Sequence, residues 1–511
     1  MAKTDVCFIT EGSYPYVVGG VSTWVHDIIS SLKDISFSLV YIGVSKELEG
    51  RIRYELPKNV LEFKEIHLMQ QPSFFKRRFS RRKEAFKELE SFIHDLARGD
   101  ISKAEAMIER FSPESSDSLT PYDIFYSWNF WEILLRTYER YFDGFSFIDY
   151  FWTVRFMVTP LFALLYEDVP EAGLYHATCT GYAGLLAVIA RLRNNASFIL
   201  TEHGIYTNER MIEITQAQWI YREQPSTVVP KRQLGILQNL WMKKFDLLSR
   251  LAYKHADAIF TLYEGNRQMQ IQGGAPPEKC EIIPNGIEVD VCEQLYLKRL
   301  AAPKKAPIVA LVGRVTPIKD VKTFIKACKI VQSEVPEARF LILGNKEEDE
   351  KYVEECERLI RVLDLQKHVT MTGSVDMRDY YPFIDCVVLT SISEAQPFVV
   401  LEAMAIGIPV VATNVGACME LLEGVDEEDR ALGRAGFITN IRSPRETADA
   451  IITILKDKDL SRRMGEAGRQ RVRRYYQRGK MLSAYEAVYR RYTGVKSKIV
   501  QRPELMAEEA G

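Results

Sequence analysis

Short apolar runs alternate with amphipathic stretches along most of this chain. In the first part the runs lie at Asp5–Thr10, Phe37–Ile42, Gly173–Ala177, Ser197–Thr201 and Ala258–Leu262, and in the second at Ile308–Val312, Arg339–Leu343, Val369–Met371, Cys386–Leu389 and Val410–Ala412. Helical patterns fall between them, as at Val21–Leu32, Gly181–Leu192, Leu234–Lys254 and up to Ser333. Buried strands that alternate with helices predict parallel sheets. We therefore expect an α/β fold with two doubly wound, Rossmann-like domains.

Residues 45–165 break this rhythm and predict a largely helical insertion that is rich in aromatic residues. Within it, Phe74–Lys83 is basic and contains three phenylalanines. Two interpretations stay open for this segment: contact with an anionic membrane or polymer, or a solvated helix face with its aromatic side chains turned inward. Leu295–Pro307 has the composition of a linker. We therefore place the domain boundary at residue 300, with a second domain over 301–480 and a loose tail over 497–511.

Composition limits the function classes. A chain of 511 residues exceeds one hydrophobic core, and 47% apolar and 27% charged residues are typical of globular proteins. A net charge of −2 gives no reason to expect nucleic acid as a partner. The eight cysteines form no CxxC pair, which favours buried thiols in a reducing cytoplasm. We expect no signal peptide and no membrane-spanning helix.

The most informative stretch runs from Thr390 to Gly416. It predicts a strand end, a polar loop, a short helix that begins at Pro397, and the next strand. A helix start after a strand presents free N–H groups to an anion such as phosphate. Glu394 in the loop and Glu402 in the helix would flank that site and accept hydrogen bonds from hydroxyl groups. The alternative is an ordinary strand–helix–strand unit with solvated acids.

Three further segments place candidate residues at strand ends. Arg314 and Lys319 follow the first strand of the second half, and two fixed cations suit a diphosphate leaving group. Gly19 and Gly20 precede the first helix, where backbone approaches a ligand closely. His203 ends another strand, where it is either structural or functional. Asp457-Lys-Asp459 is interpreted as surface, and we expect no metal ion.

Taken together, these residues resemble the retaining GT-B glycosyltransferases of family four. The resemblance rests on Gly19-Gly20, on Arg314 with Lys319, on Glu394-x7-Glu402, and on Asn285-Gly286 near the domain boundary. Tyr175–Ala187 (YHATCTGYAGLLA) and Thr201–Arg210 (TEHGIYTNER) are also similar to the cytoplasmic glycosyltransferases of bacterial Pel exopolysaccharide systems. The resemblance spans nearly the whole chain.

The resemblance implies a role for each matching position. Arg314 and Lys319 would stabilise the leaving diphosphate, Glu402 would hold the ribose, Glu394 and His203 would contact the transferred sugar, and Gly20 would approach the phosphates. The residues expected to line the nucleotide-sugar pocket are Gly19, Gly20, Arg314, Lys319, Val375, Met377, Tyr380, Glu394, Gln396, Pro397, Phe398, Val399 and Glu402. The loop Val375–Tyr381 would hold the base. A last helix over about 481–496 would return to the first, acceptor-side domain.

The implied function is transfer of a sugar from a UDP-sugar to a growing exopolysaccharide, without a metal ion or other cofactor and with retention of configuration. The implied partners are the UDP-sugar, a polysaccharide acceptor and an inner-membrane synthase or secretion complex; the implied location is cytoplasmic or peripheral at the inner membrane. Two alternatives stay open, a nucleotide-sugar epimerase on the same fold and a UDP-sensing scaffold. The donor sugar, the acceptor and the oligomeric state are open as well.

Overall fold

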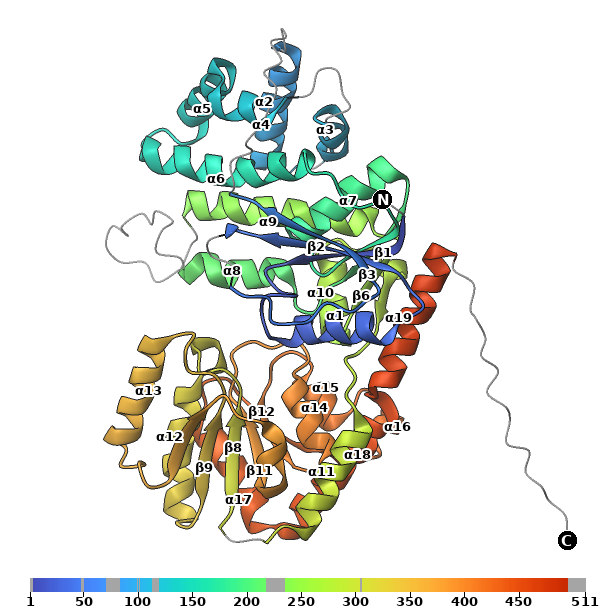
Figure 1. Cartoon of the computed structure of the whole chain (residues 1–511). Helices are drawn as coiled ribbons and strands as arrows, with labels where there is room; N and C mark the ends of the chain where they lie inside the picture. Colours follow the sequence, from blue (N-terminus) through green and yellow to red (C-terminus); the bar gives the residue numbers. More distant parts are fainter. Residues whose placement is uncertain are drawn as a thin grey trace, which may run out of the picture.

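Two parallel sheets form the framework of the protein in a computed structural model (Figure 1). The structure describes residues 3–46, 50–69, 83–98, 100, 102–112, 119–216, 235–303 and 306–494. The predicted basic segment Phe74–Lys83 lies outside these residues except for Lys83, and the tail 497–511 lies outside them entirely.

The first sheet has seven parallel strands in the order β3-β2-β1-β4-β5-β6-β7. Their bounds are β1 Thr4–Glu11, β2 Phe37–Gly43, β3 Val60–His67, β4 Ala172–Ala177, β5 Ser197–Thr201, β6 Ala258–Thr261 and β7 Cys280–Ile282. Every residue of β2 and β6 is buried, because helices cover both faces of the sheet. One helical layer contains α1 Gly20–Ser31 and the other α7 Tyr182–Asn194 and α9 Ile236–His255.

The second sheet has six parallel strands in the order β10-β9-β8-β11-β12-β13. Their bounds are β8 Ile308–Val312, β9 Arg339–Leu343, β10 Val369–Gly373, β11 Cys386–Leu389, β12 Val410–Thr413 and β13 Gly436–Thr439. The helices of this domain are α11 Val289–Ala301, η3 Pro317–Lys319, α12 Val321–Glu334, α13 Glu350–Val362, η4 Met377–Asp379, η5 Tyr381–Phe383, α14 Phe398–Ala405, α15 Cys418–Glu423, α16 Glu427–Arg430, α17 Pro444–Lys456 and α18 Lys458–Tyr475. Two doubly wound parallel-sheet domains are thus confirmed.

The insertion begins later than residue 45, because residues 60–67 form β3 at the edge of the first sheet. This strand mixes apolar and charged residues and is mostly half-buried, as an edge strand with one solvated face allows. The helical part follows as α2 Lys83–Arg98, α3 Ala104–Arg110, α4 Pro121–Tyr126, α5 Trp128–Tyr141 and α6 Phe147–Leu165. It lies at the end of the molecule away from the second domain (Figure 1).

Helix α6 is long and apolar enough, by length and composition, to cross a membrane. Unlike the sequence-based expectation, the described residues therefore contain one candidate span. It also contains Asp149 and Arg155, and its buried residues, among them Tyr150 and Leu164, pack into the core beside α7 and α9. A helix that covers part of a protein core has the same composition, and the buried residues of α6 form part of the core of the first domain.

The predicted domain boundary at residue 300 falls inside α11. The predicted linker begins inside this helix, and Cys292 and Leu295 pack into the core of the second domain together with α14. Polar residues on the solvent side of α11 gave the segment its linker-like composition. All eight cysteines lie among the described residues and none is in a disulfide, as expected.

The chain crosses between the domains twice, along neighbouring paths. Ile287 pairs with Gln477 as an isolated parallel bridge, and Gly286 lies so close to Gln477 that an added Cβ would be 2.5 Å from its carbonyl oxygen. After the second crossing, α19 Arg478–Thr493 returns to the first domain, as predicted (Figure 1). Its Tyr489 and Tyr485 hydroxyls bond His176 and Thr201 of the first sheet. The remaining first-domain helices are α8 Tyr206–Gln216, α10 Glu264–Gln272 and η2 Pro277–Lys279.

Candidate active site

The loop between β11 and α14 lies at the carboxyl end of the second sheet. Pro397 caps α14 with extended backbone and is not the first helical residue, and no side chain caps the helix start. The first N–H groups of α14 therefore face outward without a side-chain acceptor. A helix start of this kind suits an anion, and binding of a phosphate here stays a prediction.

Lys319 and Glu394 meet beside this helix start. Lys319 ends η3, and its Nζ donates to Glu394 Oε1 at 2.5 Å; the Ser391 hydroxyl donates to the same oxygen at 2.5 Å. Both side chains are mostly buried, with 21% and 13% of their surface exposed. The loops after β8 and β11 thus bring together a cation and an acid that lie far apart in the sequence.

Arg314 lies in the same loop as Lys319 but its side chain points to a different acid. Its guanidinium donates to both carboxylate oxygens of Glu348, each at 2.6 Å, and about half of the side chain is exposed. Exposed ion pairs of this kind contribute little to stability, so the guanidinium is available to a diphosphate that competes with Glu348.

Glu402 lines a hollow of about 250 Å³ between the two domains. Tyr381 Oη donates to its Oε2 at 2.5 Å. Burial raises the pKa of Glu402, and the Tyr381 hydrogen bond acts against that rise. The hollow is lined by Thr23 and Asp27 of α1, by Glu288 and Cys292, and by Met377, Tyr381, Phe398 and Glu402.

The loop proposed to hold a base is only partly at this hollow. Met377 lines it, whereas Val375 and Tyr380 pack against the core of the second domain, as Val399 does. Tyr381, the neighbour of Tyr380, is the tyrosine that reaches the hollow. Tyr380 and Tyr381 point in different directions. They lie where two separate 3₁₀ turns, η4 and η5, follow each other, and not in one continuous helix.

The first domain approaches through Gly20. A Cβ added at Gly20 would lie 3.6 Å from the ring of Phe398, whereas one at Gly19 would meet open space. Gly20, the first residue of α1, therefore lies directly across from the start of α14. Of the predicted pair, only Gly20 is in close contact with the opposite domain.

His203 follows β5 and is buried against Trp24 of α1, with ring centroids 4.7 Å apart. Burial lowers the pKa of His203 to about 4, so its ring is neutral at pH 7. Among the described residues, Nε2 of this ring has no hydrogen-bond partner. Trp24 lies one helical turn after Gly20 in α1. Through its contact with Trp24, His203 therefore packs against the same helix that begins at Gly20.

Two contacts across the cleft were missed by the sequence analysis. The side chain of Gln396, which was expected only to line the pocket, accepts from Asn285 N at 2.6 Å and donates to the Leu262 carbonyl at 3.4 Å. Arg478 lies 3.6 Å from Asp27 and pairs with Glu288 at the hollow. Neither has a sequence signal, because the partners lie in segments that are far apart in the sequence.

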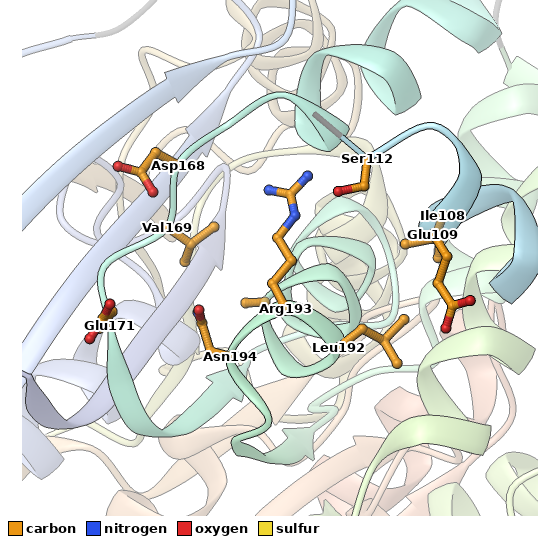
Figure 2. A pocket seen from close by; sticks show the side chains of 10 residues that line it. Ile108, Glu109, Ser112, Asp168, Val169, Glu171, Leu192, Arg193 and Asn194 are labelled. Atoms are coloured by element: carbon orange, nitrogen blue, oxygen red, sulfur yellow. The ribbon is translucent and has the colours of Figure 1, made fainter. Parts of the chain in front are cut away.

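A larger hollow of about 410 Å³ lies elsewhere, at the amino-terminal edge of the first sheet (Figure 2). Arg193 points into it beside Ser112 and Asp168, but the guanidinium already donates to the Glu167 carbonyl. This hollow is on the opposite edge from the strand ends that meet the second domain, so it is not part of the candidate site.

Asp457 and Asp459 are surface residues, as interpreted from the sequence. Asp457 caps α18 and Asp459 pairs with Arg462. Within the described ranges no group of three or more histidine, cysteine or acidic side chains is arranged to hold a metal ion. Independence of a metal stays a prediction.

Sequence comparison divides the chain as the fold does. Residues 4–278 match the family described as Domain of unknown function (DUF3492), and residues 293–471 match Glycosyl transferases group 1. N-acetyl-alpha-D-glucosaminyl L-malate synthase of Bacillus anthracis is 29% identical over 173 residues, which is 34% of this chain and 42% of the relative. D-inositol 3-phosphate glycosyltransferase of Kribbella flavida is 27% identical over 315 residues, 59% of this chain and 68% of the relative. The chain thus spans less than half of the first relative's length.

Solved structures share the whole fold. HepE of Anabaena in complex with UDP superposes with a TM-score of 0.56 at 15% identity and covers 94% of this chain and 98% of its own. Sucrose-phosphate synthase of Thermosynechococcus elongatus superposes with a TM-score of 0.57 at 16% identity, over 96% of this chain and 100% of its own. The two facing sheets are those of the GT-B fold. The chain belongs to the DUF3492 family, and its second domain matches the model of Glycosyl transferases group 1.

Proposed function

We propose that this protein transfers a hexose from a UDP-sugar to a growing exopolysaccharide of the Pel type, with retention of configuration. The observation that carries the proposal is the contact of Lys319 with Glu394 in the loop before the uncapped start of α14, whose first residue Phe398 lines an interdomain hollow together with Glu402. The cation with the helix start suits the diphosphate of a nucleotide sugar, and the two acids suit the hydroxyl groups of its sugar and its ribose.

Each residue has a role that its contacts support. The diphosphate would lie at the start of α14 and draw Lys319 from Glu394 and Arg314 from Glu348, so that both cations stabilise the leaving group. Glu394, released from Lys319, would accept hydroxyl hydrogens of the transferred sugar. Glu402 would accept those of the ribose. These groups supply the positive charge that the leaving diphosphate needs, and the proposal therefore includes no metal ion.

The first domain would hold the acceptor and close over the donor. A Cβ added at Gly20 would be in van der Waals contact with Phe398, and among the described residues the neutral ring of His203 has a nitrogen without a partner that could meet a sugar hydroxyl. Departure of the diphosphate and attack of the acceptor on the same face would retain configuration, with the leaving phosphate taking the acceptor proton. UDP as the nucleotide is supported by the UDP complex of HepE, a protein of the same fold.

The Pel assignment rests on the resemblance of Tyr175–Ala187 and Thr201–Arg210, and the membrane partner and the cytoplasmic or peripheral location rest on the same resemblance. Incubation of the full chain with UDP-glucose, UDP-N-acetylglucosamine or UDP-N-acetylgalactosamine and oligosaccharide acceptors tests the function. We expect UDP release and a lengthened glycan with one donor. A rearranged nucleotide sugar would instead indicate an epimerase, and tight UDP binding without turnover would indicate a sensor.

A further inference from the structure

We propose that Tyr381 is a positioning residue of the donor site, whose hydroxyl holds the Glu402 carboxylate in the orientation that accepts the two ribose hydroxyls. The inference rests on the proposed function, because it concerns the same nucleotide-sugar site. Tyr381 was expected only as the last residue of the loop Val375–Tyr381 that would hold the base, and neither the motif spacing nor the comparisons assign it a role toward Glu402.

The two side chains come from separate segments and meet at one hydrogen bond. Tyr381 begins η5, between β10 and β11, and Glu402 lies in the second turn of α14. The Tyr381 hydroxyl donates to Glu402 Oε2 at 2.5 Å, and both residues line the same interdomain hollow. A hydrogen bond to an ionised acid at this length is of the strong, charge-assisted kind.

This bond leaves half of the carboxylate for a ligand. Among the described residues, no second hydrogen bond or ion pair is made by the Glu402 side chain, so Oε1 has no protein partner. A glutamate side chain has three rotatable torsions and loses considerable entropy when it is held. Because Tyr381 already restricts these torsions, less entropy is lost when a ribose binds.

Tyr381 itself is suited to act as a fixed support. Only 3% of it is exposed, Pro382 follows it, and η5 packs against α11. Its ring therefore keeps its place when the ligand enters. Tyr150 offers a contrast. Its side chain is also buried, but its hydroxyl donates to the Leu134 carbonyl within the insertion, and Tyr150 does not line the interdomain hollow.

The test is calorimetric titration of the full chain with UDP and with 2′,3′-dideoxy-UDP, which lacks both ribose hydroxyls. The variants are Tyr381→Phe and Glu402→Gln, with Tyr150→Phe as the matched control for loss of a buried tyrosine hydroxyl. We expect wild type and Tyr150→Phe to bind UDP more tightly than 2′,3′-dideoxy-UDP. Tyr381→Phe should bind UDP about tenfold more weakly and dideoxy-UDP equally well, so that the preference falls.

The other outcomes distinguish the positioning role of Tyr381 from the proposed donor site. If Tyr381→Phe weakens both ligands equally, or weakens neither, the positioning role is wrong while the donor site stands. If Glu402→Gln keeps the full preference for UDP over dideoxy-UDP, Glu402 does not hold the ribose. Its place in the donor site and the positioning role of Tyr381 are then both wrong. If wild type binds neither nucleotide, the proposed function fails and the role of Tyr381 fails with it.

Discussion

The side chain of Gln396 joins the two domains, because its amide oxygen accepts the Asn285 N–H at 2.6 Å while its nitrogen reaches the Leu262 carbonyl at 3.4 Å. Gln396 belongs to the loop that carries Glu394, and its partners belong to the first domain. The loop proposed to contact the donor is thus tied to the relative position of the two domains.

We expect Gln396→Ala to weaken this connection. Leaving a buried N–H and a buried carbonyl unpaired costs about 1–3 kcal/mol, which should widen the cleft and slow turnover. X-ray scattering with and without UDP-glucose measures the change; in wild type, UDP-glucose should reduce the radius of gyration by domain closure. Gln470→Ala, which removes an exposed amide bonded only to Glu466, is the control. Identical scattering curves for Gln396→Ala and wild type would contradict the connection.

Lys319→Ala should leave the protein folded and severely weaken donor use. Loss of one charge-assisted contact to the leaving group costs about 2–4 kcal/mol in transition-state stabilisation, or about thirtyfold to a thousandfold in kcat/KM. Lys322→Ala is a matched control, since that lysine pairs with Glu355 on the exposed face of the next helix. Steady-state UDP release measures both. Near wild-type kcat/KM for Lys319→Ala would show that the site is assigned to the wrong residues.

Glu348→Gln should strengthen UDP binding. The Arg314 guanidinium must leave Glu348 before it meets a diphosphate, and an exposed ion pair is worth up to about 1 kcal/mol. Removing the competing acid should therefore lower the Kd for UDP about two- to fivefold, most clearly at low salt. Glu347→Gln removes a neighbouring charge without removing this pair. A higher Kd in Glu348→Gln would mean that Glu348 itself supports the nucleotide.

Stability should fall as the pH is lowered from about 6.5, in part because of two buried histidines. Burial lowers the pKa of His176 to about 3 and that of His203 to about 4, so between these values and 6.5 the unfolded chain binds protons that the folded chain does not. Each histidine contributes a slope of up to about 1.4 kcal/mol per pH unit. The buried Glu202, whose pKa burial raises, acts in the opposite sense.

His176→Gln isolates one of these contributions. Its loss of hydrogen bonds to Tyr489 and Thr201 should lower stability at pH 7.5, but stability should then fall less steeply towards pH 5 than in wild type. Urea unfolding across this range measures both slopes. Parallel curves for the two proteins would show that His176 does not titrate in this way.

The pattern along the chain predicted the strands with little error, because a strand buried on both faces of a parallel sheet must be apolar throughout. Val369–Met371 and Cys386–Leu389 both proved to lie within strands of the second sheet. The edge strands β3, β7 and β13 and helix α11 were missed. Partial exposure gave β3 and α11 a polar composition.

The sequence by itself determined which chemical groups this protein offers at its strand ends: Lys319, Glu394, Glu402 and a helix start after Pro397. These are local features, set by residue type and by the apolar runs before them. Only the tertiary structure decided their partners. The pairing of Lys319 with Glu394, of Arg314 with Glu348, of Tyr381 with Glu402 and of Gln396 with Asn285 depends on which strands lie side by side and on how the domains face each other. Such contacts between distant segments follow from the packing of whole sheets and helices, which local spacing does not encode.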